Sequence, residues 1–315
     1  MSTLGSPGKA VALIAGPTAS GKSDLAVELA LAFSRRCVVI NADSAQVYRD
    51  LKVLSARPSE TDMRGVEHRL FGEWDGAHAC SAADWAARAR REIENSHLAG
   101  VLPILVGGTG LYLRTLLDGI APVPPIDPAV REAVRAMPLA EAYAALGAED
   151  AARAAALNPA DTARITRSLE VVRSTRKPLA YWQQQRVGGI ASHIDLHPLV
   201  LLPPREALYA RCNARLARML ADDAIGEVRA LLARELCPSL PVMRAIGVPE
   251  IAGYLRGEWP LEDALARSQQ ATRNYAKRQY TWFRRQTPRD WLRSESENCD
   301  LKAAFEILFA YWRLT

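Results

Sequence analysis

Gly16-Pro17-Thr18-Ala19-Ser20-Gly21-Lys22-Ser23 is the stretch that decides the fold, because it matches the pattern G-x-x-x-x-G-K-[ST] in full. The apolar run Val11–Ala15 before it predicts a buried strand, and the helical spacing after it predicts a helix from Lys22 to about Ser34. In this context the backbone N–H groups, the helix N-terminus and Lys22 are expected to bind a phosphate chain, with Ser23 as a ligand of Mg²⁺. The motif alone does not identify that ligand as ATP.

Strands and helices alternate on the carboxyl side of this motif. Apolar runs predict strands at Cys37–Ile40 and Val101–Val106, and helical spacing predicts helices at Ser81–His97 and Leu111–Leu117. Ser81 and Asp84 have the spacing of an N-terminal capping box. This alternation predicts an α/β fold, a P-loop NTPase-like parallel sheet covered by helices.

The composition changes at Ala121. The segment Ala121–Pro125 holds three prolines and cannot lie inside a helix. From Pro128 to about Gln185 the pattern is helical, whereas His193–Leu202 resembles a strand that returns to the sheet. We therefore expect the first part of the core over residues 1–121, an all-helical insertion over 122–190, and the completed core with basic, mostly helical C-terminal segments over 191–315.

Composition indicates a globular protein with an anionic partner. The 315 residues are 49% hydrophobic and 24% charged, and the net charge is +5 with a pI of about 9.0. Five cysteines, an odd number without a C-x-x-C pair, indicate a reduced, cytoplasmic protein without a structural zinc site. No apolar run approaches the ~20 residues that span a bilayer, and residues 1–10 lack the apolar region of a secretory signal, so no membrane is expected as a partner.

One feature weakens an ATPase interpretation. A nucleoside triphosphatase normally has a metal-binding Asp after a second apolar strand, but the strand Val101–Val106 is followed by Gly107-Gly108-Thr109. Two alternatives remain at this point, a P-loop nucleotide or small-molecule kinase that uses ATP and an RNA-binding P-loop switch.

Four further stretches occur in order after the phosphate motif. They are Asn41-Ala-Asp-Ser-Ala-Gln-Val-Tyr-Arg49, Val106-Gly-Gly-Thr-Gly-Leu-Tyr112, Asp161-Thr-Ala-Arg-Ile-Thr-Arg-Ser-Leu-Glu-Val171 and Thr272-Arg-Asn-Tyr-Ala-Lys-Arg-Gln-Tyr-Thr-Trp-Phe-Arg284. With them the chain resembles the tRNA dimethylallyltransferase (tRNA isopentenyltransferase) family from about Val11 to Trp291. The resemblance implies transfer of a dimethylallyl group from dimethylallyl diphosphate to N6 of the adenine 3′ of the anticodon, position 37, with Mg²⁺ and diphosphate as product.

The chain departs from the family pattern in two places. Where family members usually read Asp-Ile-Gly-Thr-Ala-Lys-Pro, this chain has Lys52-Val-Leu-Ser-Ala-Arg-Pro58, and the usual Pro-His-His is Val66-Glu-His68. Both changes fall in a segment expected to face substrate. The zinc-finger extension of some eukaryotic members has no counterpart, so the resemblance is to the bacterial type.

The reaction needs a base at the adenine. Asp43 follows a strand at its carboxyl end, where open α/β sheets bind ligands, and could orient N6 and accept its proton. The alternatives are that Asp43 caps a turn or coordinates Mg²⁺ through water.

The reaction also needs donors at the diphosphate oxygen that accumulates charge. Lys22, Thr18 and Thr109 are candidates, although Thr109 could instead cap the following helix. The resemblance implies an arginine from the helix after residue 204, for which we choose Arg215; helix geometry allows Arg211 equally, and a solvated basic face is the alternative.

The C-terminal part contains a basic, aromatic window. Residues 264–289 hold no Asp or Glu but seven cations, and Tyr275, Tyr280, Trp282 and Phe283 lie among them. Cations for phosphates and rings for bases are typical of single-stranded RNA binders and argue against a small-molecule kinase. Alternatively the rings pack in the core, as we expect for Trp282, while Arg273, Lys277 and Arg278 line the site.

The partner is therefore expected to be tRNA, through its anticodon stem-loop, bound by a monomer. Asp43, Ser44, Ala45 and Gln46 would read the extruded adenine. The resemblance adds these expected tRNA contacts: Arg131, Ala163, Arg164, Ile165, Thr166, Arg167, Arg244, Ala245, Ile246, Gly247, Val248 and Pro249.

Overall fold

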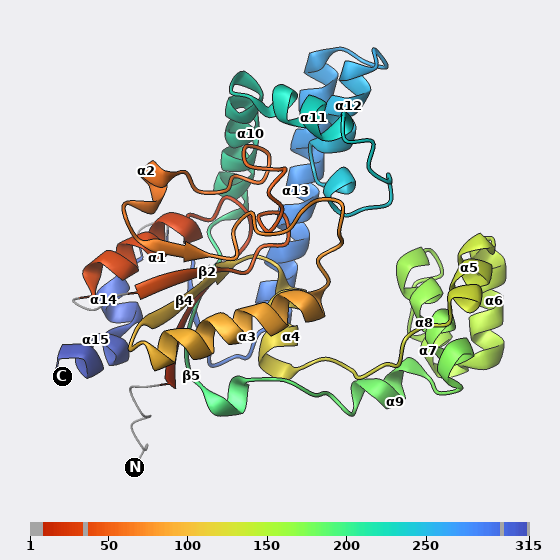
Figure 1. Cartoon of the computed structure of the whole chain (residues 1–315), viewed down its shortest axis with the longest axis horizontal. Coiled ribbons are helices and arrows are strands. Elements are labelled where there is room, and N and C mark those ends of the chain that lie inside the picture. The colour runs from red at the N-terminus through yellow and green to blue at the C-terminus, as the bar shows by residue number, and fades with distance from the viewer. Residues whose placement is uncertain (1–8, 34–36, 297–298, 314–315) are drawn as a thin grey trace. The chain divides into compact units, whose positions relative to one another are not determined.

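The computed structural model describes residues 9–33, 37–296 and 299–313, the side chains of 311–313 excepted. The chain forms two compact units, one of Met1–Leu116 with Ala191–Thr315 and one of Leu117–Ile190 (Figure 1). The helical insertion had been expected over residues 122–190. Within the described part of the chain, no helix is long and apolar enough to cross a lipid bilayer.

A six-stranded parallel sheet forms the centre of the first unit. Its strands stand in the order β3-β2-β4-β1-β5-β6. Their bounds are β1 Ala10–Ala15, β2 Cys37–Asn41, β3 Glu67–Arg69, β4 Leu102–Gly107, β5 Asp195–Leu201 and β6 Leu292–Ser294. The predicted parallel sheet is confirmed. The three-residue strands β3 and β6 were not predicted, because so short a segment carries no periodic signal.

Helices cover this sheet (Figure 1). The predicted helix after the phosphate motif is α1, Lys22–Ala32; its expected end at Ser34 lies outside the described residues. The capping box of Ser81 and Asp84 begins α3, Ala82–Leu98, as predicted. The other helices of this unit are α2 Glu60–Met63, α4 Gly110–Asp118, which runs past the unit boundary, α10 Arg205–Ala221, α11 Ala224–Leu232, α12 Val248–Leu255, α13 Leu261–Gln286, α14 Leu301–Ala304 and α15 Glu306–Arg313.

One hydrophobic core cluster of the first unit lies between the sheet and α1, α14 and α15. Every residue of β1 and β4 is buried, and Leu29 and Phe33 pack with them. The ring of Phe33 stacks on Phe309 at 4.5 Å between centroids. Helix α13 packs against α10 and α12. This arrangement brings the basic helix α13 to the carboxyl ends of the strands.

The second unit, all of whose residues are described, is helical as predicted. Its helices are α5 Pro128–Ala136, α6 Leu139–Glu149, α7 Ala151–Ala155, α8 Thr162–Thr175 and α9 Leu179–Gln183. It has a core of its own, formed by Val134, Leu146, Ile165, Leu169 and their neighbours. A separate core lets this unit fold as an insertion without altering the sheet.

Candidate functional site

The phosphate loop, residues 16–23, turns tightly between β1 and α1. Ala19 and Gly21 adopt positive φ angles of 60° and 85°, and Gly16 N donates to Gly107 O at 3.3 Å. Ser20 Oγ is buried, and among the described residues no partner lies within hydrogen-bonding distance of it. A buried hydroxyl, a helix N-terminus and a lysine therefore converge where an anion would be held.

Lys22 is a buried cation at this loop. It is only 9% exposed, and its Nζ donates to Pro17 O at 3.3 Å. Burial lowers the pKa of Lys22, while the nearby Asp43 favours the charged form and Arg215 opposes it. A bound diphosphate would add negative charge beside Lys22 and offset the cost of burying the ammonium.

Gln279 of α13 fixes the phosphate loop to the sheet. Its Oε1 accepts from Thr18 N at 2.8 Å, and its Nε2 donates to Gly108 O at 2.8 Å. The side chain is 5% exposed, so both hydrogen bonds are shielded from water. We did not identify Gln279 as a site residue from the sequence. The sequence signal that could have identified it is its position: Gln279 is a polar residue on the face of α13 that also carries the buried Thr272, Ala276 and Phe283.

Close packing explains the two glycines at the end of β4. A Cβ atom at Gly107 would collide with the backbone of Ala42, and one at Gly108 would collide with Gln279. Any side chain here would push apart β4, the segment after β2 and α13. Among the described residues, no group of three or more His, Cys, Asp or Glu side chains is arranged to hold a metal ion.

Asp43 lies just beyond β2 in a rigid turn. Its N–H donates to Asn41 Oδ1 at 2.8 Å, and its Oδ1 accepts from Ala45 N at 2.9 Å. Asn41 is fully buried, donates to Asp43 O, and accepts at its own carbonyl from Trp85 Nε1. One carboxylate oxygen thus caps a turn, which was the alternative role, while the buried side chain also lines a cavity. We did not identify Asn41 as a positioning residue from the sequence.

Thr109 binds the turn that carries Asp43. Its Oγ1 accepts from Ser44 N at 2.9 Å and donates to Ser44 Oγ at 3.2 Å. The Tyr275 hydroxyl also interacts with both side chains; burial, then the charge of Asp43, raises the pKa of this tyrosine. Thr109 precedes α4, as expected for a helix cap, and donation from its hydroxyl to a leaving diphosphate stays a prediction.

Two arginines of α10 reach the phosphate loop at different points. Arg215 donates to Thr18 Oγ1, and Arg211 Nε donates to Ala19 O at 2.9 Å. Burial lowers the pKa of Arg215, and Cys212 and Asp43 oppose that effect. Arg215 therefore binds a side chain of the loop and lines a cavity, whereas Arg211 binds the loop backbone. The choice of Arg215 for the diphosphate stays a prediction.

Two cavities open beside the phosphate loop. The first has a volume of about 340 Å³ and is lined by Thr18, Asp43 and Arg215, by the apolar Leu51, Leu54 and Leu216, and by Arg244, Ala245 and Ile246. The second, of about 620 Å³, is lined by Ser23 and the cations Lys52, Arg57 and Arg218. Arg215 and Met219 contribute to both. We call residues 51–58 the wall segment, because it supplies side chains to each cavity.

The predicted tRNA contacts of the first unit divide into two groups. Ser44, Ala45, Arg244–Ile246 and Arg278 line the first cavity. Gln46 instead holds the wall segment, since its Nε2 donates to Ser55 O and Ala56 O at 3.0 and 2.9 Å. Val248 is buried, and its contact with tRNA stays a prediction.

The cations of α13 also differ in their surroundings. Arg273 is partly buried and donates to Asn213 Oδ1 of α10 at 2.7 Å, whereas Lys277 is exposed. Trp282, expected in the core, is only partly buried beside Gly110, and the fully buried ring is Phe283. The basic window is thus both a packing face and an exposed cationic face, as the two sequence interpretations together suggested.

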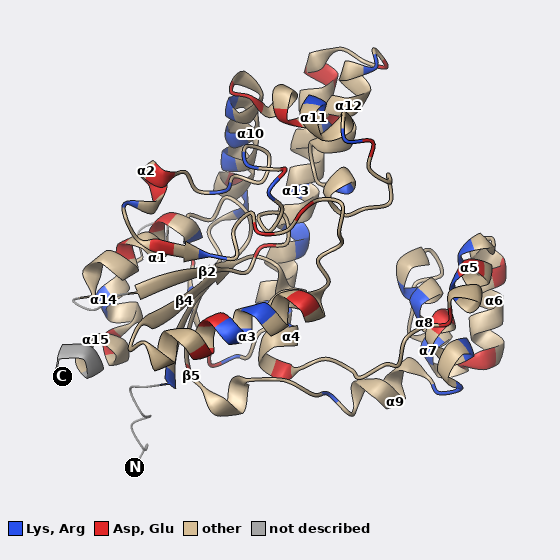
Figure 2. Ribbon diagram, viewed as in Figure 1, with Lys and Arg blue, Asp and Glu red and all other residues tan. Residues whose placement is uncertain are grey.

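In the helical unit, basic side chains surround a buried carboxylate. Glu170 is 3% exposed and accepts from Arg135 Nε at 3.0 Å, with Arg167 at 3.8 Å. Arg131 lies close enough to Arg167 to lower its pKa, after burial as the main cause. Ile165 was predicted to contact tRNA but is fully buried, because it lies on the apolar face of α8. Figure 2 marks the lysines and arginines of this unit and those along α10.

Known proteins resemble this chain over almost its full length. Two family models match it, IPP transferase over residues 46–286 and isopentenyl transferase over residues 9–76. A tRNA dimethylallyltransferase of Erythrobacter litoralis is 64% identical over 304 residues, 96% of each chain. One of Novosphingobium aromaticivorans is 67% identical over 261 residues, 83% of this chain and 93% of that protein.

Solved structures agree with this fold. The tRNA isopentenylpyrophosphate transferase of Bacillus halodurans superposes with a TM-score of 0.67 at 30% identity, covering 96% of this chain and 95% of that one. A eukaryotic dimethylallyltransferase described as acting on tRNA gives 0.75 at 28% identity, covering 87% of this chain and 70% of that one.

Proposed function

Because the chain belongs to the tRNA dimethylallyltransferase family, in its bacterial type, we propose that it transfers the dimethylallyl group of dimethylallyl diphosphate to N6 of adenine 37 in tRNA. The observation that carries this proposal is that a buried carboxylate, Asp43, and the cation Arg215 at the phosphate loop line one cavity. The relatives are tRNA dimethylallyltransferases, so the ATP-dependent kinase is not favoured.

The phosphate loop binds the leaving group. Lys22, Arg215 and the hydroxyl of Thr18 surround the position where the bridging oxygen gains charge as the C–O bond breaks. Donors fixed before the reaction cost no reorganisation in the transition state. Ser20 Oγ, buried without a partner among the described residues, supplies a further donor.

Mg²⁺ is the proposed cofactor, and the donor set fits it. Ser23 is the second residue of α1 and lines the second cavity. In such sites Mg²⁺ binds one or two protein oxygens together with phosphate oxygens and water. A bound Mg²⁺ ion would neutralise charge on the diphosphate. Ser23 would hold it.

Asp43 takes the proton of the nucleophile. The N6 lone pair forms a bond to the allylic carbon, the C–O electron pair leaves on diphosphate, and the N6 proton passes to the carboxylate of Asp43. Its Oδ1 is held by Ala45 N, which orients the other oxygen. Asn41 and Thr109 keep this turn in place and act as positioning residues.

The tRNA anticodon stem-loop is the proposed nucleic-acid partner. Arg278 and Arg244 line the first cavity from α13 and the segment before α12, and Lys277 is exposed on the same helix. Arg131, Arg164 and Arg167 supply cations in the helical unit. We propose that the protein acts on tRNA as a monomer in the cytoplasm.

Incubation with labelled dimethylallyl diphosphate, Mg²⁺ and either unmodified tRNA or AMP tests the proposal. Label should appear on tRNA and on no other acceptor. Transfer to AMP alone would show a transferase of free nucleotides. In a parallel incubation with labelled ATP, phosphate transfer without prenylation would show a kinase.

A further inference from the structure

The wall segment has few hydrogen bonds of its own. It forms two short-range backbone bonds, from Ala56 N to Val53 O and from Arg57 N to Lys52 O. Ser55 Oγ adds a bond to Leu51 O at 2.6 Å. Leu51 and Leu54 nevertheless form part of the apolar lining of the first cavity, while Lys52 and Arg57 line the second. A loop with so little internal structure needs an external partner to hold its side chains in place.

Gln46 holds the second half of the wall segment through Ser55 O and Ala56 O, and Glu227 of α11 holds its first half. Glu227 Oε1 accepts from the N–H groups of Lys52 and Val53, the latter at 2.9 Å, and Glu227 Oε2 accepts from Leu54 N at 2.9 Å. Three successive amides thus surround one carboxylate, and charge-assisted bonds of this kind are roughly twice as strong as neutral ones. More than 170 residues separate the partners, so this contact is purely tertiary.

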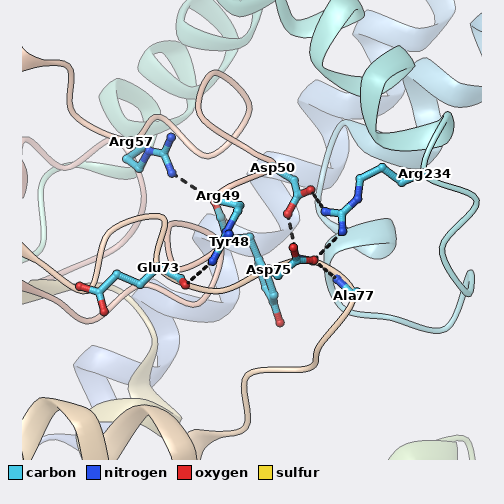
Figure 3. A network of polar contacts seen from close by, with 9 residues as sticks. Tyr48, Arg49, Asp50, Arg57, Glu73, Asp75, Ala77 and Arg234 are labelled. Carbon is cyan, nitrogen blue, oxygen red and sulfur yellow. Dashed lines mark hydrogen bonds and ion pairs between the residues drawn. The ribbon is translucent and has the colours of Figure 1, made fainter.

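A second contact from the same region supports the start of the wall segment. Arg234, two residues beyond α11, binds the carboxylates of both Asp50 and Asp75 (Figure 3). Asp50 also accepts from Gly76 N at 2.8 Å. Arg234 therefore fixes the residue just before Leu51, and Glu227 fixes the three residues after it. The far side of the wall segment meets Gly247, where a Cβ atom would collide with Leu54.

We propose that Glu227 is a positioning residue that holds Leu51 and Leu54 as a rigid wall for the prenyl group of the donor. This inference rests on the proposed function, which places dimethylallyl diphosphate in the first cavity. A fixed wall accepts a five-carbon group and excludes a longer one. Without Glu227 the partly buried amides of Val53 and Leu54 and the exposed amide of Lys52 lose their acceptor, and the wall segment relaxes away from the cavity.

Steady-state kinetics of Glu227→Ala and Glu227→Gln, with dimethylallyl and geranyl diphosphates as donors, test this role. Glu227→Ala is expected to raise KM for dimethylallyl diphosphate about tenfold or more with kcat within about threefold, because the wall binds substrate and transition state alike. It should also permit measurable transfer of the ten-carbon group. Glu227→Gln retains one oxygen acceptor for three amides, so it should show an intermediate rise in KM of about threefold. Glu94→Ala, at an exposed position of α3, is the matched control.

The outcomes separate this inference from the proposed function. Wild-type protein that does not prenylate tRNA would overturn both. Active wild-type protein, with KM and donor selectivity unchanged in a folded Glu227→Ala variant, would overturn the positioning role alone. Where Glu227→Ala does not fold, the Glu227→Gln variant decides: wild-type KM and selectivity at an unchanged melting temperature would contradict the need for a carboxylate.

Discussion

Replacing Gln279 should loosen the phosphate loop and weaken donor binding together. In Gln279→Leu the side-chain volume is nearly kept, but Thr18 N and Gly108 O lose their partners at 2.8 Å each. An unsatisfied buried group costs about 1–3 kcal/mol, so two of them should lower the free energy of unfolding by about 2–6 kcal/mol. Urea titration followed by circular dichroism measures this change.

Donor affinity should fall in parallel. Thr18 is held by Gln279 through its backbone and by Arg215 through its hydroxyl. If the loop loses one well-placed hydrogen bond to a charged ligand, worth about 1.5–3 kcal/mol, binding weakens about 10- to 150-fold. Calorimetric titration with dimethylallyl diphosphate measures the affinity. Gln279→Leu with unchanged stability and unchanged donor affinity would refute the anchoring role.

Gln279→Glu separates the two hydrogen bonds of this side chain. A carboxylate still accepts from Thr18 N, but its second oxygen faces Gly108 O unless the group is protonated. The folded state therefore raises the pKa of this glutamate, so stability is present at low pH and is lost as pH rises through the raised pKa. Gln270→Glu adds the same charge at an exposed position of α13 and should show no such dependence.

Three further predictions concern catalysis, tRNA binding and pH. Asp43→Ala should lower kcat by about 100-fold or more with little change in tRNA affinity, and a loss of affinity alone would make it a binding residue only. Lys277→Ala should reduce the slope of log K against log salt for tRNA by about 0.7–0.9, while Lys302→Ala in α14 should not; a large fall in melting temperature instead would indicate a packing role. Burial lowers the pKa of Lys22 in the free protein and a bound diphosphate should raise it, so binding at alkaline pH should take up a proton and weaken as pH rises. Calorimetry in buffers of different ionisation enthalpy should detect this proton uptake in the wild type and not in Lys22→Met. Wild-type binding without proton uptake would contradict the assignment of Lys22 as the group that is protonated.

The sequence by itself determined the elements whose signals are local. The phosphate loop, the long buried strands and the capping box of Ser81 depend on residues within one or two turns of each other, so their patterns are complete in the chain. The place of Asp43 also followed locally, because a residue just after a parallel strand lies at the ligand-binding edge of the sheet. Resemblance to a family then supplied the reaction.

Only the tertiary structure decided which residues meet. Gln279 bonds to Thr18 across 261 positions, Arg215 reaches Thr18 across 197, and Glu227 reaches the wall segment across more than 170. Burial likewise showed that the side chains of Ile165 and Val248 pack in the interior. Hydrogen bonds and burial between distant segments depend on how α8, α10, α11 and α13 pack, and a side chain's partner in such contacts leaves no periodic trace in the sequence.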